Sequence, residues 1–220
     1  MGINITISEV IKSRIPEIRL GCIRATVEVK PATPGLLKHI DEVCDDIRGL
    51  LQIDGVSQVD TIAATRAAYR KLGKDPARYR PSAEALTRRV LQGKSLYRVN
   101  NIVDALNSIS LASGFSIGGY DLATIEGQIE LGVGLEGEPY QAIGRGMLNI
   151  ESLPVLRDKL GPFGSPTSDS DRTMITALTG EFLMVFFDFS KNEKLENIVI
   201  DSTRIYETHC GVKQSSYWII

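Results

Sequence analysis

Amide and carboxylate side chains recur at helical spacing between residues 100 and 107. Asn100, Asp104 and Asn107 stand at positions i, i+4 and i+7, so on a helix they would share one face, with Asn101 beside them. Such a set supplies both hydrogen-bond donors and acceptors, and could hold a ribose hydroxyl group or an ammonium group. A helix-starting asparagine and an aspartate that satisfies a buried loop would explain the same residues without a ligand. The pattern leaves both interpretations open.

Basic residues gather in the segment from Arg66 to Arg98. This segment holds ten lysine or arginine residues against two acidic ones, a local charge of +8 in a chain whose formal net charge is −2. Tyrosines lie among these cations, a composition that favours contact with phosphates and stacked bases. The residues that we predict to bind RNA are Arg66, Tyr69, Arg70, Arg78, Tyr79, Arg80 and Arg88. The alternatives are a solvated helical face, or pairing of Arg66 and Arg88 with acidic neighbours inside the fold.

The sequence gives little support for a cofactor or a metal ion. Gly132 to Gly137 matches G-x-G-x-x-G, but Tyr140 to Ile143 continues as a strand rather than a helix, which favours a tight turn over a dinucleotide site. Asp169 and Asp171 lack further ligands at metal-binding spacing. The two histidines lie far apart in sequence, so a histidine-based triad is not expected. We therefore expect no metal and no cofactor.

Composition indicates one domain, which we place at residues 1–220. With 43% hydrophobic and 24% charged residues, the chain can bury a substantial core. Its longest apolar run, Phe182 to Phe187, is far shorter than the ~20 residues of a membrane-spanning helix. The first residues do not resemble a secretory signal, and the three cysteines form no C-x-x-C pattern. These features predict a cytoplasmic protein.

Hydrophobic periodicity and turn residues predict the elements that position these groups. We expect helices over residues 34–51, 58–72, 81–91, 100–112 and 195–210. Strands are expected near residues 3–8, 18–29, 125–135, 138–143 and 181–188, and at the end of the chain. Because the strands cluster instead of alternating with helices, the predicted fold class is α+β.

Several stretches carry a resemblance to a known family. They are Arg66-Ala-Ala-Tyr69 through Pro81-Ser-Ala-Glu84, Ile102-Val-Asp-Ala-Leu-Asn107, Gly114-Phe-Ser-Ile-Gly-Gly-Tyr-Asp121, and Gly137-Glu138 followed by Tyr140. The last three resemble V-V-D-x-x-N, G-x-P-L-x-x-[FY]-D and G-E before an aromatic residue, motifs of the B3/B4 domain of the bacterial phenylalanyl-tRNA synthetase β subunit. The resemblance spans roughly residues 60–190. It implies a mixed β-sheet or barrel core with flanking helices.

In the synthetase, the B3/B4 domain hydrolyses the ester of a wrongly attached amino acid on the tRNA terminus. The resemblance thus implies a freestanding tRNA-interacting protein and raises the hypothesis of an aminoacyl-tRNA deacylase that acts in trans. Asn100, Asn101, Asp104, Asn107 and Asp121 would then bind substrate, and Glu138 or Asp169 would orient water. The alternatives are a non-catalytic RNA-binding module and a binder of an amino acid or related metabolite.

The chain departs from the family pattern at two places. The histidine of the family's P-L-H-A-[FY]-D motif is Gly118 here, so the chain has no imidazole at that position. The later Gly-Gly-Glu-like site has no counterpart in Gly161 to Asp169. Nothing in the sequence resembles the synthetase's catalytic subunit, so ligation of an amino acid to tRNA is not expected.

Overall fold

The computed structural model describes residues 3–220, and Met1 and Gly2 of the predicted domain lie outside the described residues. Two four-stranded sheets dominate the β structure. One sheet is antiparallel and is called the larger sheet because its strands are longer. Its order is β10 (Ser215–Ile219), β2 (Arg19–Thr26), β9 (Glu181–Asp188) and β3 (Ser116–Asp121). The smaller sheet has the order β1 (Ile5–Ile7), β4 (Ile129–Val133), β7 (Pro154–Asp158) and β8 (Gly161–Gly164), with a separate pair formed by β5 (Gln141–Ala142) and β6 (Gly146–Met147).

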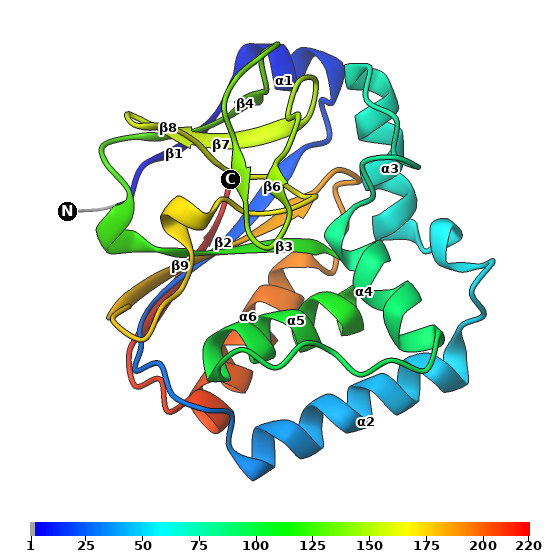
Figure 1. The fold of residues 1–220 in the computed structure, drawn as a ribbon, viewed down its shortest axis with the longest axis vertical. Coiled ribbons are helices and arrows are strands. Elements are labelled where there is room, and N and C mark those ends of the chain that lie inside the picture. The colour runs from blue at the N-terminus through cyan, green and yellow to red at the C-terminus, as the bar shows by residue number, and fades with distance from the viewer. Residues whose placement is uncertain (1–2) are drawn as a thin grey trace.

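Six α-helices occur in residues 3–220. They are α1 (Glu9–Arg14), α2 (Pro34–Leu50), α3 (Asp60–Leu72), α4 (Ser82–Leu91), α5 (Asn101–Ser113) and α6 (Leu195–Cys210). In Figure 1, α2, α5 and α6 lie on one side of the larger sheet, and the smaller sheet lies on its other side. The arrangement confirms the α+β class. No helix among the described residues combines the length and hydropathy that a membrane span requires.

Strand β9 forms the centre of the molecule because both of its faces are covered. Its residues alternate between two clusters: Phe182, Met184 and Phe186 pack on the helical side, whereas Leu183 and Val185 pack toward the smaller sheet. All five side chains are fully buried. A strand that is apolar on both faces reads as a continuous apolar run, which is how the sequence predicted it.

The five long helices were predicted to within two residues at each end. Helix α3 stops at Gly73 and α5 at Gly114, where φ is +94° and +71°. These left-handed conformations favour glycine and end a helix. The G-x-G-x-x-G stretch was also predicted correctly as a turn, because β4 ends at Val133 and no helix follows Gly137.

The prediction of the β structure was incomplete. Strand β3 was not predicted because its two glycines have low strand propensity, yet it pairs with β9 along its whole length. The predicted strand 138–143 shrinks to β5, and helix α1 follows directly after β1. Of the mixed β-sheet or barrel core that the resemblance implied, the structure has the mixed sheet: β1 is parallel to β4, β7 is antiparallel to β4, and both four-stranded sheets stay open within residues 3–220.

Candidate functional site

The polar residues at the start of α5 are engaged in contacts within the chain. Asn100 is the N-cap, and its Oδ1 accepts hydrogen bonds from two N–H groups of the first turn at 3.1 and 2.9 Å. Buried Asn101 ties the segment 28–30 to the helix by donating to one of its carbonyls and accepting from one of its N–H groups. Buried Asp104 accepts from the N–H of Val99 at 2.8 Å. These contacts match the structural interpretation of this motif.

Asn107 and Asp121 differ in how fully they are engaged. Buried Asp121 accepts from the N–H of Ala123 at 3.0 Å and from the hydroxyl of Thr179 at 2.7 Å. Asn107 is half-buried, and its amide makes no hydrogen bond within residues 3–220. Of the five predicted substrate-binding residues, Asn107 is therefore the one whose side chain retains its full hydrogen-bonding capacity.

A buried carboxylate pairs with three of the predicted RNA-binding arginines. Glu84 is 1% exposed at its side chain and accepts from Arg66 Nη1 at 2.8 Å and from Arg88 Nε at 2.9 Å. Arg80 Nε lies 3.6 Å from the same carboxylate. A buried charge is costly unless it is paired, so these guanidinium groups compensate Glu84 and join α3 to α4. For Arg66 and Arg88 the structure shows the acidic pairing that was the alternative to RNA contact.

The other predicted RNA-binding residues divide into buried and exposed ones. Tyr69 is fully buried, and the ring of half-buried Tyr79 is covered by Lys74 Nζ at 3.7 Å from its centroid. Arg70 and Arg78 are exposed, and neither pairs with a carboxylate among residues 3–220. A free cationic surface at these positions therefore rests on Arg70 and Arg78.

Glu138, one of the two carboxylates predicted to orient water, is held by an ion pair. Arg157 Nη2 donates to both of its oxygens, at 3.0 and 2.9 Å, and the N–H of Leu135 donates to Oε2 at 2.9 Å. The side chains of Glu138 and Arg157 are 14% and 23% exposed. Both oxygens of Glu138 are thus occupied by donors that fix the turn after β4.

Asp169, the second carboxylate, lies beside β3, an edge strand of the larger sheet. Tyr120 Oη donates to Asp169 Oδ1 at 2.9 Å, and the N–H of Gly119 donates to Oδ2 at 3.3 Å. Burial raises the pKa of Asp169 from its ordinary 3.8 to about 7, and the two hydrogen bonds limit that rise because they favour the ionised form. A carboxyl group with this pKa exchanges a proton with water near neutral pH.

Residues 165–169, here called the Asp169 loop, are anchored by three buried tyrosines. Tyr69 Oη lies 2.8 Å from the hydroxyl of Thr167, and Tyr140 Oη donates to the carbonyl of Ser168 at 2.7 Å. Tyr120 supplies the third hydroxyl through Asp169 itself. The three rings are at most 2% exposed, so the core fixes the position of this loop.

The structure places Gly118 next to Asp169 although 50 residues separate them. A Cβ atom built on Gly118 would lie 3.0 Å from Asp169 Oδ1. The sequence singled out both residues but did not predict that they would be neighbours, and it missed Tyr120, which appeared only as the aromatic residue of a motif. Gly119, Ser168 and Asp169 stay partly exposed, so the site reaches the surface. There Asp169 could accept a proton from a water molecule.

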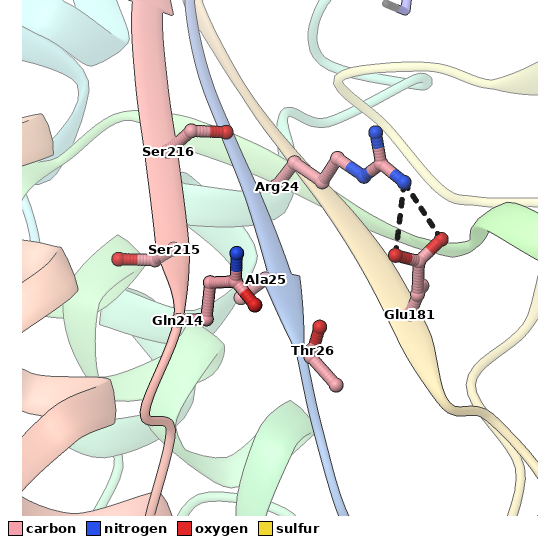
Figure 2. Close-up of a pocket in the computed structure, with 7 residues that line it drawn as sticks. All are labelled: Arg24, Ala25, Thr26, Glu181, Gln214, Ser215 and Ser216. Atoms are coloured by element: carbon pink, nitrogen blue, oxygen red, sulfur yellow. Dashed lines mark hydrogen bonds and ion pairs between the residues drawn. The ribbon is translucent and has the colours of Figure 1, made fainter. Parts of the chain in front are cut away.

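A second feature is a polar hollow of about 240 Å³ at the opposite edge of the larger sheet. Figure 2 shows its lining on β10, β2 and the start of β9, with Arg24 bound to both oxygens of Glu181 at 2.9 Å. None of the predicted site residues lines this hollow. Among residues 3–220, no group of three or more His, Cys, Asp or Glu side chains is arranged to hold a metal ion.

Comparisons with known proteins match the central part of the chain to one family. Residues 64–208 match the family model described as the B3/4 domain. Among solved structures, the fold is similar to an N-terminal fragment of the phenylalanyl-tRNA synthetase beta-subunit from Pyrococcus horikoshii, with 12% identity and a TM-score of 0.47 over 97% of this chain. The chain spans 50% of the length of that fragment. The comparison with curated proteins found no match.

Proposed function

Because the chain belongs to the B3/4 domain family, whose model matches residues 64–208, we propose that residues 1–220 form one such domain that interacts with tRNA and hydrolyses a mischarged aminoacyl ester in trans. The observation that carries the proposal is Asp169, a carboxyl group with a pKa of about 7 beside Gly118, where the resemblance places the family's histidine. Both residues lie inside the matched segment. A single domain is supported by the two largest core clusters, which cover opposite faces of one sheet.

In the proposed reaction, the ionised Asp169 accepts a proton from a water molecule as the water oxygen attacks the carbonyl carbon of the ester. The tetrahedral intermediate then collapses, the bond between the carbonyl carbon and the ribose oxygen breaks, and Asp169 returns the proton to that oxygen. The products are the free amino acid and a tRNA with a free terminal hydroxyl group. A pKa of about 7 suits both steps, because general acid–base catalysis is most efficient when the pKa lies near the working pH.

Asn107 is the proposed contact to the substrate, because its amide is not used within residues 3–220. An amide can donate to the ester carbonyl or the ribose and accept from the ammonium group of the amino acid. Asn107→Ala should therefore weaken turnover without changing the fold. We assign the water-orienting role to Asp169 and not to Glu138, because Glu138 is paired with the cation of Arg157, whereas Asp169 accepts from the neutral donors Tyr120 and Gly119.

The test is to incubate the purified chain with a panel of mischarged aminoacyl-tRNAs and to measure hydrolysis as the loss of the labelled ester. Asp169→Asn should reduce the rate by about 100-fold or more, the usual effect of removing a general base. Asp171→Asn is the matched control, because Asp171 is an exposed carboxylate two residues away. Full activity of Asp169→Asn, or no hydrolysis of any substrate by the wild type, would contradict the proposal.

The second candidate is binding of tRNA without turnover, and the exposed guanidinium groups of Arg70 and Arg78, which pair with no carboxylate among residues 3–220, favour it. Each phosphate contact adds about 0.9 to the slope of log affinity against log salt concentration. Arg70→Glu with Arg78→Glu should weaken binding and reduce this slope by about 2. Arg14→Glu with Arg204→Glu changes the net charge equally at exposed positions outside the basic segment, and should have a smaller effect. Equal losses in the two double variants would exclude a local binding surface.

A further inference from the structure

Building on the function proposed for Asp169, we propose that Tyr120 is the positioning residue of the site: its hydroxyl group holds the Asp169 carboxyl and fills the space that a side chain at position 118 would need. Tyr120 acts through Asp169, so it need not touch the reacting atoms.

The phenol of Tyr120 is enclosed on several sides. A Cβ atom built on either Gly118 or Gly164 would overlap its hydroxyl group. The fully buried ring packs edge-on against Phe163, with centroids 4.9 Å apart and an interplanar angle of 84°. Within residues 3–220 the hydroxyl has one hydrogen-bond partner, Asp169 Oδ1 at 2.9 Å. Two glycines thus make room for a hydroxyl group that is directed at one carboxylate oxygen.

Charge and protonation make Tyr120 the donor of this hydrogen bond. Burial, with the neighbouring Asp169, raises the pKa of Tyr120 well above 10, so the phenol keeps its proton. Its hydrogen bond favours the ionised form of Asp169 and opposes the effect of burial on that pKa. The other titratable groups around Tyr120 and the Asp169 loop include the phenols of Tyr69 and Tyr140 and the thiol of Cys22, which stay protonated because burial raises their pKa. Arg172 is paired with a buried aspartate.

This geometry gives a physical reason for the departure from the family pattern. A histidine at position 118 would need the volume that the Tyr120 hydroxyl occupies. An imidazole at 118 and the Tyr120–Asp169 hydrogen bond are therefore mutually exclusive arrangements of the same site. This chain carries the second one.

The test is a titration of the Asp169 carboxyl carbon by ¹³C NMR on the full chain, independent of any tRNA substrate. Tyr120→Phe removes the donor, so the Asp169 midpoint should move upward from about 7 by about one pH unit. Gly118→Ala should displace the phenol and move the midpoint in the same direction, without adding to the effect of Tyr120→Phe. Gly180→Ala is the control, because its added Cβ meets no atom within 4 Å and Gly180 makes no contact with Asp169.

Thermal unfolding of each variant confirms that it is folded before it is titrated. If Tyr120→Phe does not fold, a fluorinated tyrosine at position 120 keeps the shape and makes the hydroxyl more acidic, and should lower the Asp169 midpoint. If the Asp169 midpoint is unchanged in folded Tyr120→Phe or in the fluorinated protein, the Tyr120 hydroxyl does not hold the Asp169 carboxyl. A wild-type midpoint in Gly118→Ala would overturn the exclusion at position 118.

The rate of ester hydrolysis separates this inference from the proposed function. If the wild type is active, the pH profile of kcat/KM for Tyr120→Phe should shift upward with the Asp169 midpoint, with about a ten-fold loss at pH 6 and recovery at high pH. A uniform loss at all pH values would indicate a purely structural role and would contradict the inference. If the wild type is inactive but the midpoints move as expected, the role of Tyr120 stands and the proposed reaction fails.

Discussion

Replacing Asp169 with asparagine should remove a pH dependence from the free energy of unfolding. In the folded protein the pKa of Asp169 is about 7, whereas in the unfolded chain it returns to about 3.8. Between these two values the folded state keeps a proton that the unfolded state has lost. The stability that this proton provides is fully present below about pH 4 and is lost as the pH rises through 7.

The magnitude follows from the difference between the two pKa values. Each pH unit between them changes the free energy of unfolding by about 1.4 kcal/mol per proton. From pH 5 to pH 7 the wild type should therefore lose up to about 3 kcal/mol through Asp169. This is an upper value because Asp169 is half-buried.

The assay is urea unfolding of wild type and Asp169→Asn at several pH values from 5 to 8.5, monitored by the fluorescence of the single tryptophan. Other groups also contribute to the pH dependence of stability, including His39, whose pKa is lowered by burial and by the neighbouring His209. The difference between the two proteins cancels these contributions. Parallel stability curves for wild type and variant would refute the reasoning, and the exposed Asp171→Asn variant should give such a parallel curve.

Three further substitutions test contacts made by other residues. Glu84→Gln leaves three arginines without their buried partner and should lower the free energy of unfolding by about 3 kcal/mol in urea unfolding, whereas exposed Glu136→Gln should not. Lys74→Met removes two hydrogen bonds to main-chain carbonyls and should lower the free energy of unfolding by about 2 kcal/mol in the same assay. An unchanged urea midpoint would mean that the ammonium group contributes nothing to stability. Gly114→Ala combines a positive φ with overlap of a threonine side chain, whereas Gly93→Ala has a similar φ of +77° and open space around its added Cβ. The melting temperature of Gly114→Ala should therefore fall further than that of Gly93→Ala. Equal losses of melting temperature in the two variants would show that the overlap is unimportant.

Much of the helical structure could be predicted because its signals are local. A helix such as α5 follows from a periodic apolar stripe, the capping Asn100 and the terminal Gly114, all within about 15 residues of sequence. Strand β3 could not be predicted in this way, since Gly118 and Gly119 argue against a strand locally. It exists because β9 offers it a complete set of hydrogen-bonding partners.

The residues of the candidate site also divide into those that the local sequence singles out and those that only the fold brings together. The sequence by itself identified the family and the α+β class, and it singled out Gly118 and Asp169 as candidate positions. Only the tertiary structure decided that Tyr120 joins them, and that Arg66 and its neighbours serve a buried glutamate. The reason is physical: a side chain's protonation and partners depend on burial and on contacts between residues far apart in sequence, and neither is encoded in local spacing.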